Sequence, residues 1–470
     1  MQYIKGEHRR QVSLLPAVVD DYVAEEALVR VVDAFVGSLD FQALGFERAT
    51  PATTGRPGYD PRDMLRLYLY GYINEVRSSR RLERESKRNV EVMWLLGRLT
   101  PDFKTIADFR RDNGAAIIAA CRAFVLFSRT QGLLGGQMIA IDGSKFRAAA
   151  SQKRVRGRWE IAQAVTRIDA EVASYLARLD EADAAEPEDQ TKASISAAIA
   201  ALSDRRTELG ELVTWMEAEH RSTIVDGEPD ARPMGTGLGR KPPSYNVQSA
   251  VDAQSGIIIH HDVITDANDF QSLHPVAVGA KAALGGVPIR VVADTGYSSG
   301  VHAAACEANG IEPCVPAHRA VNNQGAFFDR SAFAYDRDAD VYTCPSGRSL
   351  VRRAPLKGRP MIRYMAKDCR GCELKPRCTD APKRSVKRHI NEDALDRMNA
   401  RFEADPGLRR LRRCTVEHPF GTIKRMSGGG RYLTRGLPKV KTETALSVLA
   451  YNLIRASNLI GKGQLAQRLA

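Results

Sequence analysis

Two short apolar runs that each lead into an aspartate constrain this chain more than any other feature. The first covers residues 138–141 and is followed by Asp142 and Gly143; the second covers residues 289–293 and is followed by Asp294. A short apolar run bounded by a turn residue predicts a buried β-strand. Open α/β sheets place their chemistry at the ends of such strands. The pattern therefore predicts an α/β core with two candidate catalytic aspartates, although an aspartate after a strand is also a common turn former or helix cap.

A third acidic residue, Glu417, lies in a segment with helical spacing. Arg413, Phe420 and Lys424 fall on the same helical face as this glutamate, while Pro419 is expected to start or kink the helix. Two aspartates and one glutamate can hold two divalent cations about 4 Å apart, the arrangement of two-metal phosphoryl transfer. The alternative is that the three acids are independent caps and salt-bridge partners.

The charge of the chain is concentrated in one segment. The whole sequence of 470 residues carries a formal net charge of +13. Residues 348–388 alone hold fourteen Lys or Arg residues against three acidic ones. Such a local excess favours a polyanionic partner. The length predicts two to four domains, and no apolar run approaches the roughly 18 residues of a membrane span.

Residues 1–135 are predicted to be helical. Asp60 and Pro61 form an N-cap followed by proline at the first helical position, and an apolar stripe follows. After a short polar break at residues 78–79, a basic helix is expected, which is compatible with a helix-turn-helix that enters the major groove. A helical bundle with a solvated basic face is the alternative. The candidate DNA-contacting side chains here are Arg77, Arg80, Arg81 and Arg84.

Residues 155–235 are predicted to form an antiparallel helical hairpin inserted into the sheet domain. Two apolar seams at coiled-coil spacing flank an acidic, proline-broken connector at residues 180–189. Packing or assembly is its expected role. The first seam holds Ile161, Val165, Ile168, Val172, Tyr175 and Leu179, and the second holds Ile195, Ile199, Leu202, Leu209, Val213 and Met216.

Three smaller features complete the core region. The glycine tract 235–239 is not a phosphate loop, because no strand precedes it and the Gly-Lys-Ser/Thr ending is missing. Adjacent side chains of a strand point to opposite faces, so His260 and His261 are expected at the surface rather than at a shared metal. Residues 442–460 are predicted to form a closing helix, and the tail 461–470 is expected to be frayed.

Residues 320–404, which include this basic segment, contain four of the eight cysteines, namely Cys344, Cys369, Cys372 and Cys378. Thiolates held on glycine-containing turns are typical of a tetrahedral zinc site. We expect one structural Zn²⁺ that closes this segment; an iron–sulfur cluster or unligated thiols are the alternatives. Lys383 and Arg384, which follow the last of these cysteines, are expected to contact DNA phosphates.

These motifs together resemble the DDE transposases of bacterial insertion sequences, which carry a ribonuclease-H-like catalytic core. Residues 141–145 resemble the block of the first catalytic aspartate, residues 245–252 the hairpin block, residues 293–297 the block of the second aspartate and residues 416–424 the glutamate block. Residues 58–113 resemble the helical domain that such transposases carry.

Many relatives show a Tyr-Arg-Glu-Lys signature around the last acid. Arg413, Glu417 and Lys424 match its spacing, but the tyrosine position holds Arg410. This departure puts a tyrosine-specific role in doubt and leaves metal binding untouched. By the resemblance, Arg413 and Lys424 would hold phosphate near the scissile bond.

The resemblance implies a metal-dependent enzyme that cleaves DNA at transposon ends and transfers the strand into target DNA. Its implied catalytic and metal-binding residues are Asp142, Asp294 and Glu417, with two Mg²⁺ or Mn²⁺ ions per site. Its partners would be double-stranded DNA and, on that DNA, a second copy of the chain; neither a membrane nor a small-molecule cofactor is expected. The implied location is the bacterial cytoplasm, at the nucleoid. The rivals are a catalytically inactive DNA-binding protein of the same fold and a metal-dependent nuclease without strand transfer.

The expected architecture is therefore an α/β chain of four parts. Residues 1–135 form an all-α DNA-binding domain, and residues 136–318 with 405–460 form a ribonuclease-H-like core around a mixed sheet. Residues 155–235 are the hairpin insertion, and residues 320–404 are a basic insertion with a four-cysteine zinc site.

Overall fold

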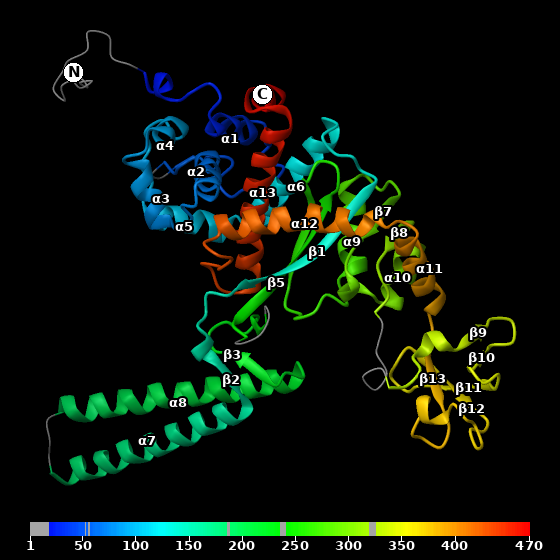
Figure 1. Ribbon diagram of the computed structural model, residues 1–470. Helices are drawn as coiled ribbons and strands as arrows, with labels where there is room; N and C mark the ends of the chain where they lie inside the picture. Colours follow the sequence, from blue (N-terminus) through cyan, green and yellow to red (C-terminus); the bar gives the residue numbers. More distant parts are fainter. Residues whose placement is uncertain (1–17, 52, 55–56, 186–188, 236–240, 319–325) are drawn as a thin grey trace, which may run out of the picture.

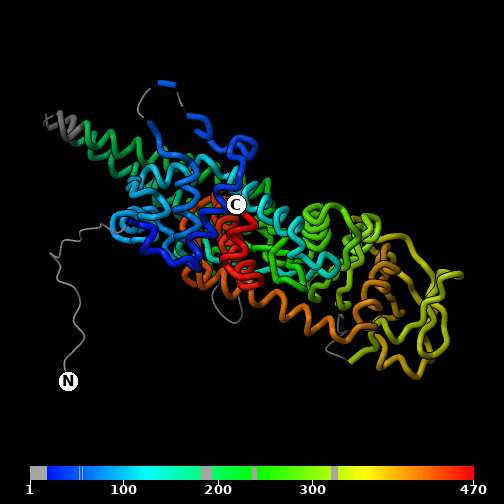
Figure 2. The backbone as a smooth tube through the Cα atoms, turned by 90° about the horizontal axis from the view of Figure 1, so that it is seen from above, coloured from blue at the N-terminus to red at the C-terminus, as the bar shows by residue number. Residues whose placement is uncertain are grey.

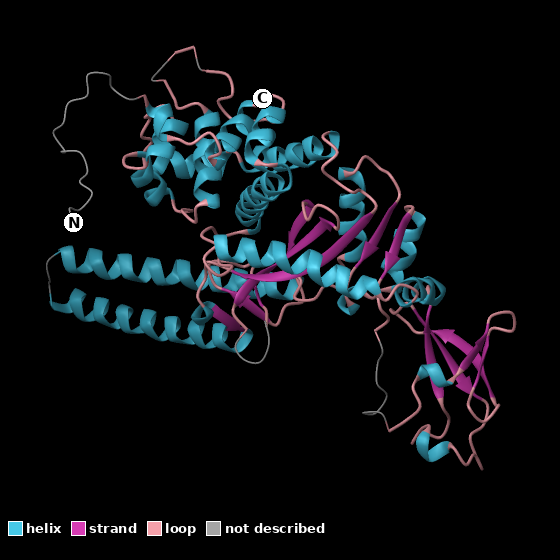
Figure 3. Cartoon of the chain, turned by 45° about the horizontal axis from the view of Figure 1, so that its top comes forward, coloured by secondary structure: helices cyan, strands magenta, loops and turns pink. Residues whose placement is uncertain are grey.

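The computed structural model describes residues 18–51, 53–54, 57–185, 189–235, 241–318 and 326–470. Its elements form a group of N-terminal helices, a central sheet with helices on both faces, a long helical hairpin and a second, smaller sheet (Figures 1 and 3). The N-terminal helices and the smaller sheet lie at opposite ends of the molecule (Figure 2). The expected mixed α/β class with N-terminal helices is confirmed. Residues 236–239 of the glycine tract lie outside the described residues.

The N-terminal helices begin where the capping residues predict. The Asp60 carboxylate accepts a hydrogen bond from the backbone N–H of Arg62, and Pro61 is the first residue of α2. The Ser78 hydroxyl accepts one from the backbone N–H of Arg81 at the start of α3. The helices are α1 (Leu28–Gly37), α2 (Pro61–Ile73), α3 (Ser79–Ser86), α4 (Val90–Leu95), α5 (Phe103–Asp112) and α6 (Gly114–Thr130).

The central sheet combines parallel and antiparallel strands. Strand β1 pairs in parallel with β7, which pairs in parallel with β8; on its other edge β1 pairs antiparallel with β5, which pairs antiparallel with both β6 and β4. An antiparallel meander thus continues into two parallel strands reached through crossovers. The strands are β1 (Met138–Arg147), β4 (Arg232–Pro233), β5 (Pro243–Asp252), β6 (Ile258–Ile264), β7 (Ile289–Val292) and β8 (Ile311–Cys314).

Helices cover both faces of this sheet. One apolar cluster joins a sheet face to α9 (Leu273–Ala283), α10 (Gly300–Ala308) and α11 (Glu392–Glu403). The opposite face packs against α12 (Gly407–Met426), α13 (Leu437–Ile460) and α6. Helix α11 thus belongs to the core, so the cysteine-rich insertion ends before residue 404.

Helix α13 joins the N-terminal helices to the sheet. It is buried on all sides over most of its length and contacts α2 and α6 as well as β6. One continuous apolar cluster therefore contains Leu65 of α2 and Val251 of β5, so residues 1–135 share a core with the sheet. The expectation of a frayed tail is wrong, because α14 (Lys462–Leu469) buries Leu465 and Leu469 against α1.

The predicted hairpin is present and projects from the sheet (Figure 1). Helices α7 (Arg158–Ala185) and α8 (Asp189–Ala218) pack on each other, with seam residues Ile161 and Leu209 buried between them. The seam is interrupted at Arg206, whose guanidinium forms an ion pair of 2.7 Å with Asp169. A two-stranded sheet of β2 (Val155–Gly157) and β3 (Thr223–Val225) closes its base.

The basic segment folds as a sheet of its own, which the sequence did not predict. Strands β9 to β13 pair antiparallel in sequence order. Tyr342 and Tyr364 are buried at its centre beside Tyr335, and Asp340 accepts hydrogen bonds from the hydroxyls of Tyr335 and Tyr364. Aromatic side chains thus supply a small core despite the charge of the segment. The strands are β9 (Ala334–Asp336), β10 (Val341–Thr343), β11 (Ser349–Pro355), β12 (Met361–Ala366) and β13 (Ser385–His389).

Candidate active site

The register of β1 and β7 places the two predicted aspartates next to each other. The last parallel pair is Ala140 with Val292, and Asp142 and Asp294 each follow two residues later. Strand β7 ends at Val292, whereas β1 continues to Arg147; beyond Ala140 it pairs with β5, and Arg147 at its end also forms a parallel bridge with Arg431. Asp142 is therefore in the middle of its strand and not at the strand end. Asp142 lies just beyond the point where β1 stops pairing with β7.

A single arginine connects the two aspartates. One terminal nitrogen of Arg412 lies 2.7 Å from an oxygen of Asp142 and 3.3 Å from an oxygen of Asp294. These two oxygens are therefore no more than 6.0 Å apart, the sum of those distances. The side chains of Asp142 and Arg412 are 19% and 20% exposed, while that of Asp294 is 47% exposed. The pair thus has one buried and one accessible carboxylate.

Sequence reasoning selected Arg413 on α12 and missed Arg412. Arg412 precedes the buried residues Val416, Pro419 and Ile423 at spacings of four, seven and eleven, which places it on the helix face that meets the sheet. This apolar spacing was the available signal. Arg413 is exposed and borders the cavity described below.

Burial changes the protonation of the first aspartate. It raises the pKa of Asp142 to about 6, and the neighbouring charge of Asp294 adds to this rise. The guanidinium of Arg412 and a hydrogen bond from the backbone N–H of Gly143 (2.9 Å) oppose the rise without cancelling it. A cation close to this carboxylate favours its ionised form.

A polar network behind β1 supports the turn of the second aspartate. Asp269, which was not predicted, accepts hydrogen bonds of 2.7 Å from the side-chain amides of Asn246 and Gln248. The Tyr297 hydroxyl, three residues after Asp294, donates to Gln248 at 2.5 Å. A Cβ on Gly143 would lie 2.5 Å from an Asp269 oxygen, so a larger residue at this position would have to displace that carboxylate. The network connects β5 to the turn that follows β7.

Helix α12 carries the third predicted acid across the sheet (Figure 1). Glu417 is exposed, and in the described part of the chain neither a hydrogen bond nor an ion pair joins it to the two aspartates. Phe420 packs on Phe146 of β1, and the Lys424 amine lies 5.5 Å from the centre of the same ring. Burial lowers the pKa of this lysine. Pro419 neither starts nor ends α12, which runs through it without interruption.

A cavity opens beside the second aspartate. It has a volume of about 630 Å³ and is lined by Asp294, by Thr295 and by three arginines of α12, Arg409, Arg412 and Arg413. Of these, Arg409 forms an ion pair of 3.3 Å with Glu403. A cavity with cationic walls next to carboxylates suits a phosphodiester chain.

Three of the four N-terminal arginines that were predicted to contact DNA are exposed. Arg80, Arg81 and Arg84 are exposed on α3. Arg80 also stacks on the ring of Phe103, with its guanidinium carbon 4.8 Å from the ring centre. Helix α3 therefore presents a basic surface, which both a recognition helix and a solvated bundle face would have.

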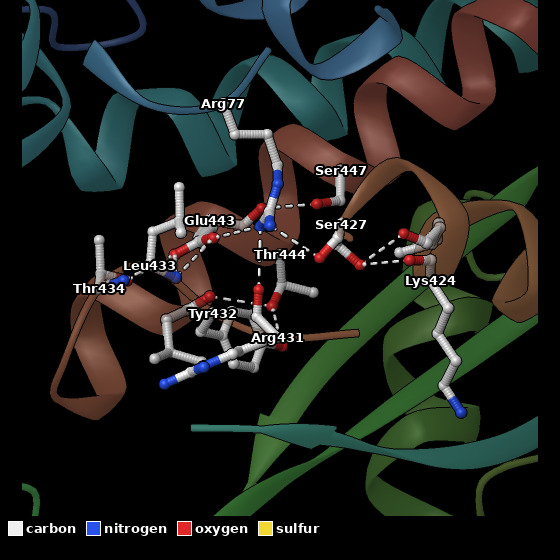
Figure 4. A network of polar contacts seen from close by, with 12 residues as sticks. Arg77, Lys424, Ser427, Arg431, Tyr432, Leu433, Thr434, Glu443, Thr444 and Ser447 are labelled. Carbon is white, nitrogen blue, oxygen red and sulfur yellow. Dashed lines mark hydrogen bonds and ion pairs between the residues drawn. The ribbon is translucent and has the colours of Figure 1, made fainter. Parts of the chain in front are cut away.

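Arg77 has a different role from the one expected. It is 9% exposed and forms an ion pair of 2.9 Å with Glu443 of α13, which is 0% exposed (Figure 4). Its guanidinium also donates to the backbone carbonyls of Ser427 (2.7 Å) and Arg431 (3.1 Å). The expectation that Arg77 contacts DNA is wrong, because its guanidinium is buried and paired with Glu443. It links the start of α3 to the loop that follows α12.

The basic sheet also uses one of its predicted DNA contacts internally. The Arg384 guanidinium donates hydrogen bonds of 2.8 Å to the carbonyls of Cys378 and Phe328 and stacks on Phe333. We therefore correct its expected role from phosphate contact to holding the segment together. Lys383 is exposed and free to meet a polyanion.

The four predicted cysteines converge. Cys344, Cys369, Cys372 and Cys378 all line one small cavity of the basic sheet. Backbone N–H groups of Arg348 and Arg384 donate to the sulfurs of Cys344 (3.3 Å) and Cys369 (3.4 Å). A hydrogen bond between the side chains of Cys372 and Ser346 and the charge of Arg348 lower the pKa of Cys372, whereas burial raises that of Cys378.

Two sets of residues in the described chain have the chemistry of metal ligands. Two adjacent carboxylates that already share a cation suit Mg²⁺, which prefers oxygen, and four thiols around one cavity suit Zn²⁺. As their side chains stand, no group of three or more His, Cys, Asp or Glu residues within the described ranges is arranged to hold a metal ion. Among the helices that the structure describes, none is long and apolar enough to cross a membrane.

Two segments of the chain match known protein families. Residues 17–112 match a family model described as a transposase domain, DUF772, and residues 343–457 match one described as a transposase DDE domain. The second match contains α12, and its family implies a ribonuclease-H-like fold, in agreement with the order of strands in the central sheet. No curated protein matches the chain. With these two matches on either side of the paired aspartates, the chain contains two transposase family domains, consistent with a DDE transposase of an insertion sequence.

Proposed function

We propose that this transposase cleaves DNA at the ends of its element and joins the freed strand to target DNA. The observation that carries the proposal is the pair Asp142 and Asp294, which come from separate parallel strands and bracket one cation. Phosphoryl transfer needs anionic ligands for divalent metals together with cations that bind phosphate. The arginines beside this pair supply the cations.

The two aspartates and Glu417 are the proposed ligands of two Mg²⁺ or Mn²⁺ ions. When bound, such ions stabilise charge on the attacking and the leaving oxygen of an in-line displacement at phosphorus. The chain itself orients the first ligands: β1 fixes Asp142, and the turn held by Tyr297 fixes Asp294. Glu417 is exposed on a helix that packs over β1, so a rotation of its side chain is the only movement that the proposal assigns to it.

The proposed path of DNA runs from α3 to the aspartates. Arg80, Arg81 and Arg84 would read the ends of the element, because reading bases requires a helix in a groove. Arg413 in the cavity wall and Lys424 beside β1 would hold phosphates near the reacting bond. Exposed cations of the basic sheet, Lys383 among them, would add affinity without base preference.

A structural Zn²⁺ held by the four cysteines is a separate part of the proposal. Four thiolates leave no open coordination position, so this ion would clamp the basic sheet and take no part in chemistry. The measurement is elemental analysis of protein purified without added metal. We expect about one zinc per chain, lost in Cys372→Ser and retained in Cys414→Ser, whose cysteine is exposed on α12. Iron with a visible absorption band, or four freely alkylated thiols, would reject zinc.

An assembly of two copies on DNA completes the proposal. The hairpin supports it, because its helices project away from the core and expose Trp159 (68%) and Leu176 (47%). Sedimentation of the chain with and without end DNA measures the number of copies in the complex. A complex with one copy per DNA end pair would refute the two-copy assembly.

The decisive experiment is one reaction with Mg²⁺, the flanking DNA ends and a target plasmid. We expect cleaved ends and joined products from the wild type. Asp142→Asn should abolish both while leaving end binding nearly intact, because the carboxylate is needed for chemistry rather than for recognition. Cleaved ends without joined products would indicate a nuclease, and binding without cleavage an inactive DNA-binding protein.

A further inference from the structure

We propose that Arg412 competes with the divalent metal: in the chain without DNA its guanidinium occupies the space between Asp142 and Asp294 and keeps their metal affinity low. The inference rests on the proposed function, because it takes the two aspartates as metal ligands. It goes beyond that function by assigning a role to a residue outside the Arg413–Glu417–Lys424 signature.

The geometry of this contact differs from that of a structural ion pair. An arginine that serves only stability usually meets a carboxylate with two parallel N–H groups. Here one terminal nitrogen serves two acids, at 2.7 Å from Asp142 and 3.3 Å from Asp294. The Nε of Arg412 is buried without a hydrogen-bond partner in the described structure. One cation centre shared by two carboxylates is the charge arrangement that a bridging metal would replace.

The surroundings of Arg412 strengthen its attraction to the aspartates and also give its guanidinium room to leave them. Asp142 and Arg412 are each about one-fifth exposed, so water screens their attraction only in part. Arg412 also borders the cavity of about 630 Å³ that contains Arg409 and Arg413. A guanidinium displaced from the aspartates therefore has room on the side where a phosphate would lie, and a phosphate would bind it there.

The expected size of the effect follows from the same charge. An opposite charge within 4–6 Å changes the proton affinity of a carboxylate by roughly 10- to 1,000-fold. A divalent cation at the same oxygens meets the same field with twice the charge. We therefore expect that removing the guanidinium raises metal affinity by at least about tenfold.

The test measures Mn²⁺ binding to the full chain without DNA, by titration calorimetry and by the paramagnetic signal of free Mn²⁺. Arg412→Gln should bind Mn²⁺ at least about tenfold more tightly than wild type. Arg413→Gln removes the same charge one residue along, where it has no contact with the aspartates, and should change affinity far less. Asp142→Asn in the Arg412→Gln background should lose the added affinity.

The outcomes separate this inference from the proposed function. Equal or weaker Mn²⁺ binding by Arg412→Gln, with binding still lost in Asp142→Asn, would overturn the role of Arg412 and leave the metal-dependent function in place. No Mn²⁺ binding by any variant would overturn both.

A second measurement covers the case in which Arg412→Gln does not fold. Wild-type chain is treated with phenylglyoxal, which modifies accessible arginines, with and without saturating Mn²⁺. Peptide mapping should show faster modification of Arg412 when Mn²⁺ is present, because the metal releases its guanidinium. Arg413 is the internal control and should react at the same rate in both samples. An unchanged or slower rate at Arg412 would overturn the inference.

Discussion

Replacing Arg77 by methionine should destabilise the joint between the N-terminal helices and the catalytic sheet. Glu443 is 0% exposed and would lose the arginine that now lies 2.9 Å away. Removing one partner of a buried ion pair costs about 3–5 kcal/mol. Glu443 retains hydrogen bonds from the backbone N–H groups of Leu433 and Thr434 and from the Thr434 hydroxyl, which favours the lower part of that range.

Two carbonyls also lose the guanidinium as a donor in this variant, and of these the Ser427 carbonyl keeps a hydrogen bond of 3.4 Å from the backbone N–H of Arg431. Arg77 now donates to Ser427 at 2.7 Å and to Arg431 at 3.1 Å. A buried acceptor left without a partner costs about 1–3 kcal/mol. With about 3 kcal/mol for the ion pair and about 1 kcal/mol for the Arg431 carbonyl, the expected loss is about 4 kcal/mol, a large part of the 5–15 kcal/mol that is typical of folded domains.

The assay is urea unfolding followed by far-UV circular dichroism. The matched control is Arg81→Met, which removes an exposed arginine four residues along and should change the free energy of unfolding by no more than about 0.5 kcal/mol. The double variant Arg77→Met, Glu443→Gln should lose less free energy of unfolding than the two single variants together, because it leaves no buried charge unpaired. A loss below about 1 kcal/mol for Arg77→Met, or simple additivity, would refute the reasoning.

Three further predictions concern other parts of the chain. Burial lowers the pKa of His261 to about 3; because the unfolded chain takes up this proton near pH 6.5 and the folded chain does not, stability should fall on acidification from pH 6.5 towards pH 3, by about 2 kcal/mol at pH 5. The melting temperature should depend less on pH in His261→Gln than in the wild type across this range, and an equal pH dependence in both would refute the assignment. Gly143→Ala should lower stability by about 1–3 kcal/mol through its clash with Asp269 and Gln248, measured by melting temperature against Gly37→Ala, where a Cβ meets no atom within 4 Å. Arg80→Ala or Arg81→Ala should reduce the preference for element ends over random DNA in gel-shift competition, and an equal loss on both DNAs would exclude α3 as the recognition helix.

The histidine prediction also corrects the sequence analysis. His260 and His261 point to opposite faces of β6 as expected, but neither is a surface residue: both are half-buried, and a Cβ on Gly279 of α9 would overlap the ring of His260. Strand periodicity predicts which face a side chain takes. It does not predict which helix covers that face.

The local features of this protein could be predicted from the sequence. The apolar runs before Asp142 and Asp294 predicted buried strands, Asp60 predicted a helix start, the polar break at residues 78–79 predicted the basic helix after it, and the two seams predicted the hairpin. Each of these depends on residues within a few positions of one another, because caps and periodic faces are properties of a short stretch of backbone.

Which charges form pairs depends on the tertiary structure. Arg412 and Arg413 are neighbours in sequence, and the packing of α12 on β1 turns the first to the aspartates and the second to the cavity. Arg77 resembled its basic neighbours, yet it pairs with Glu443, 366 residues away. The aromatic core of the basic sheet was hidden in the same way, since its tyrosines are scattered along the segment. Partners that far apart leave no local pattern, because the folded core alone brings them within the few ångströms at which charges and rings interact.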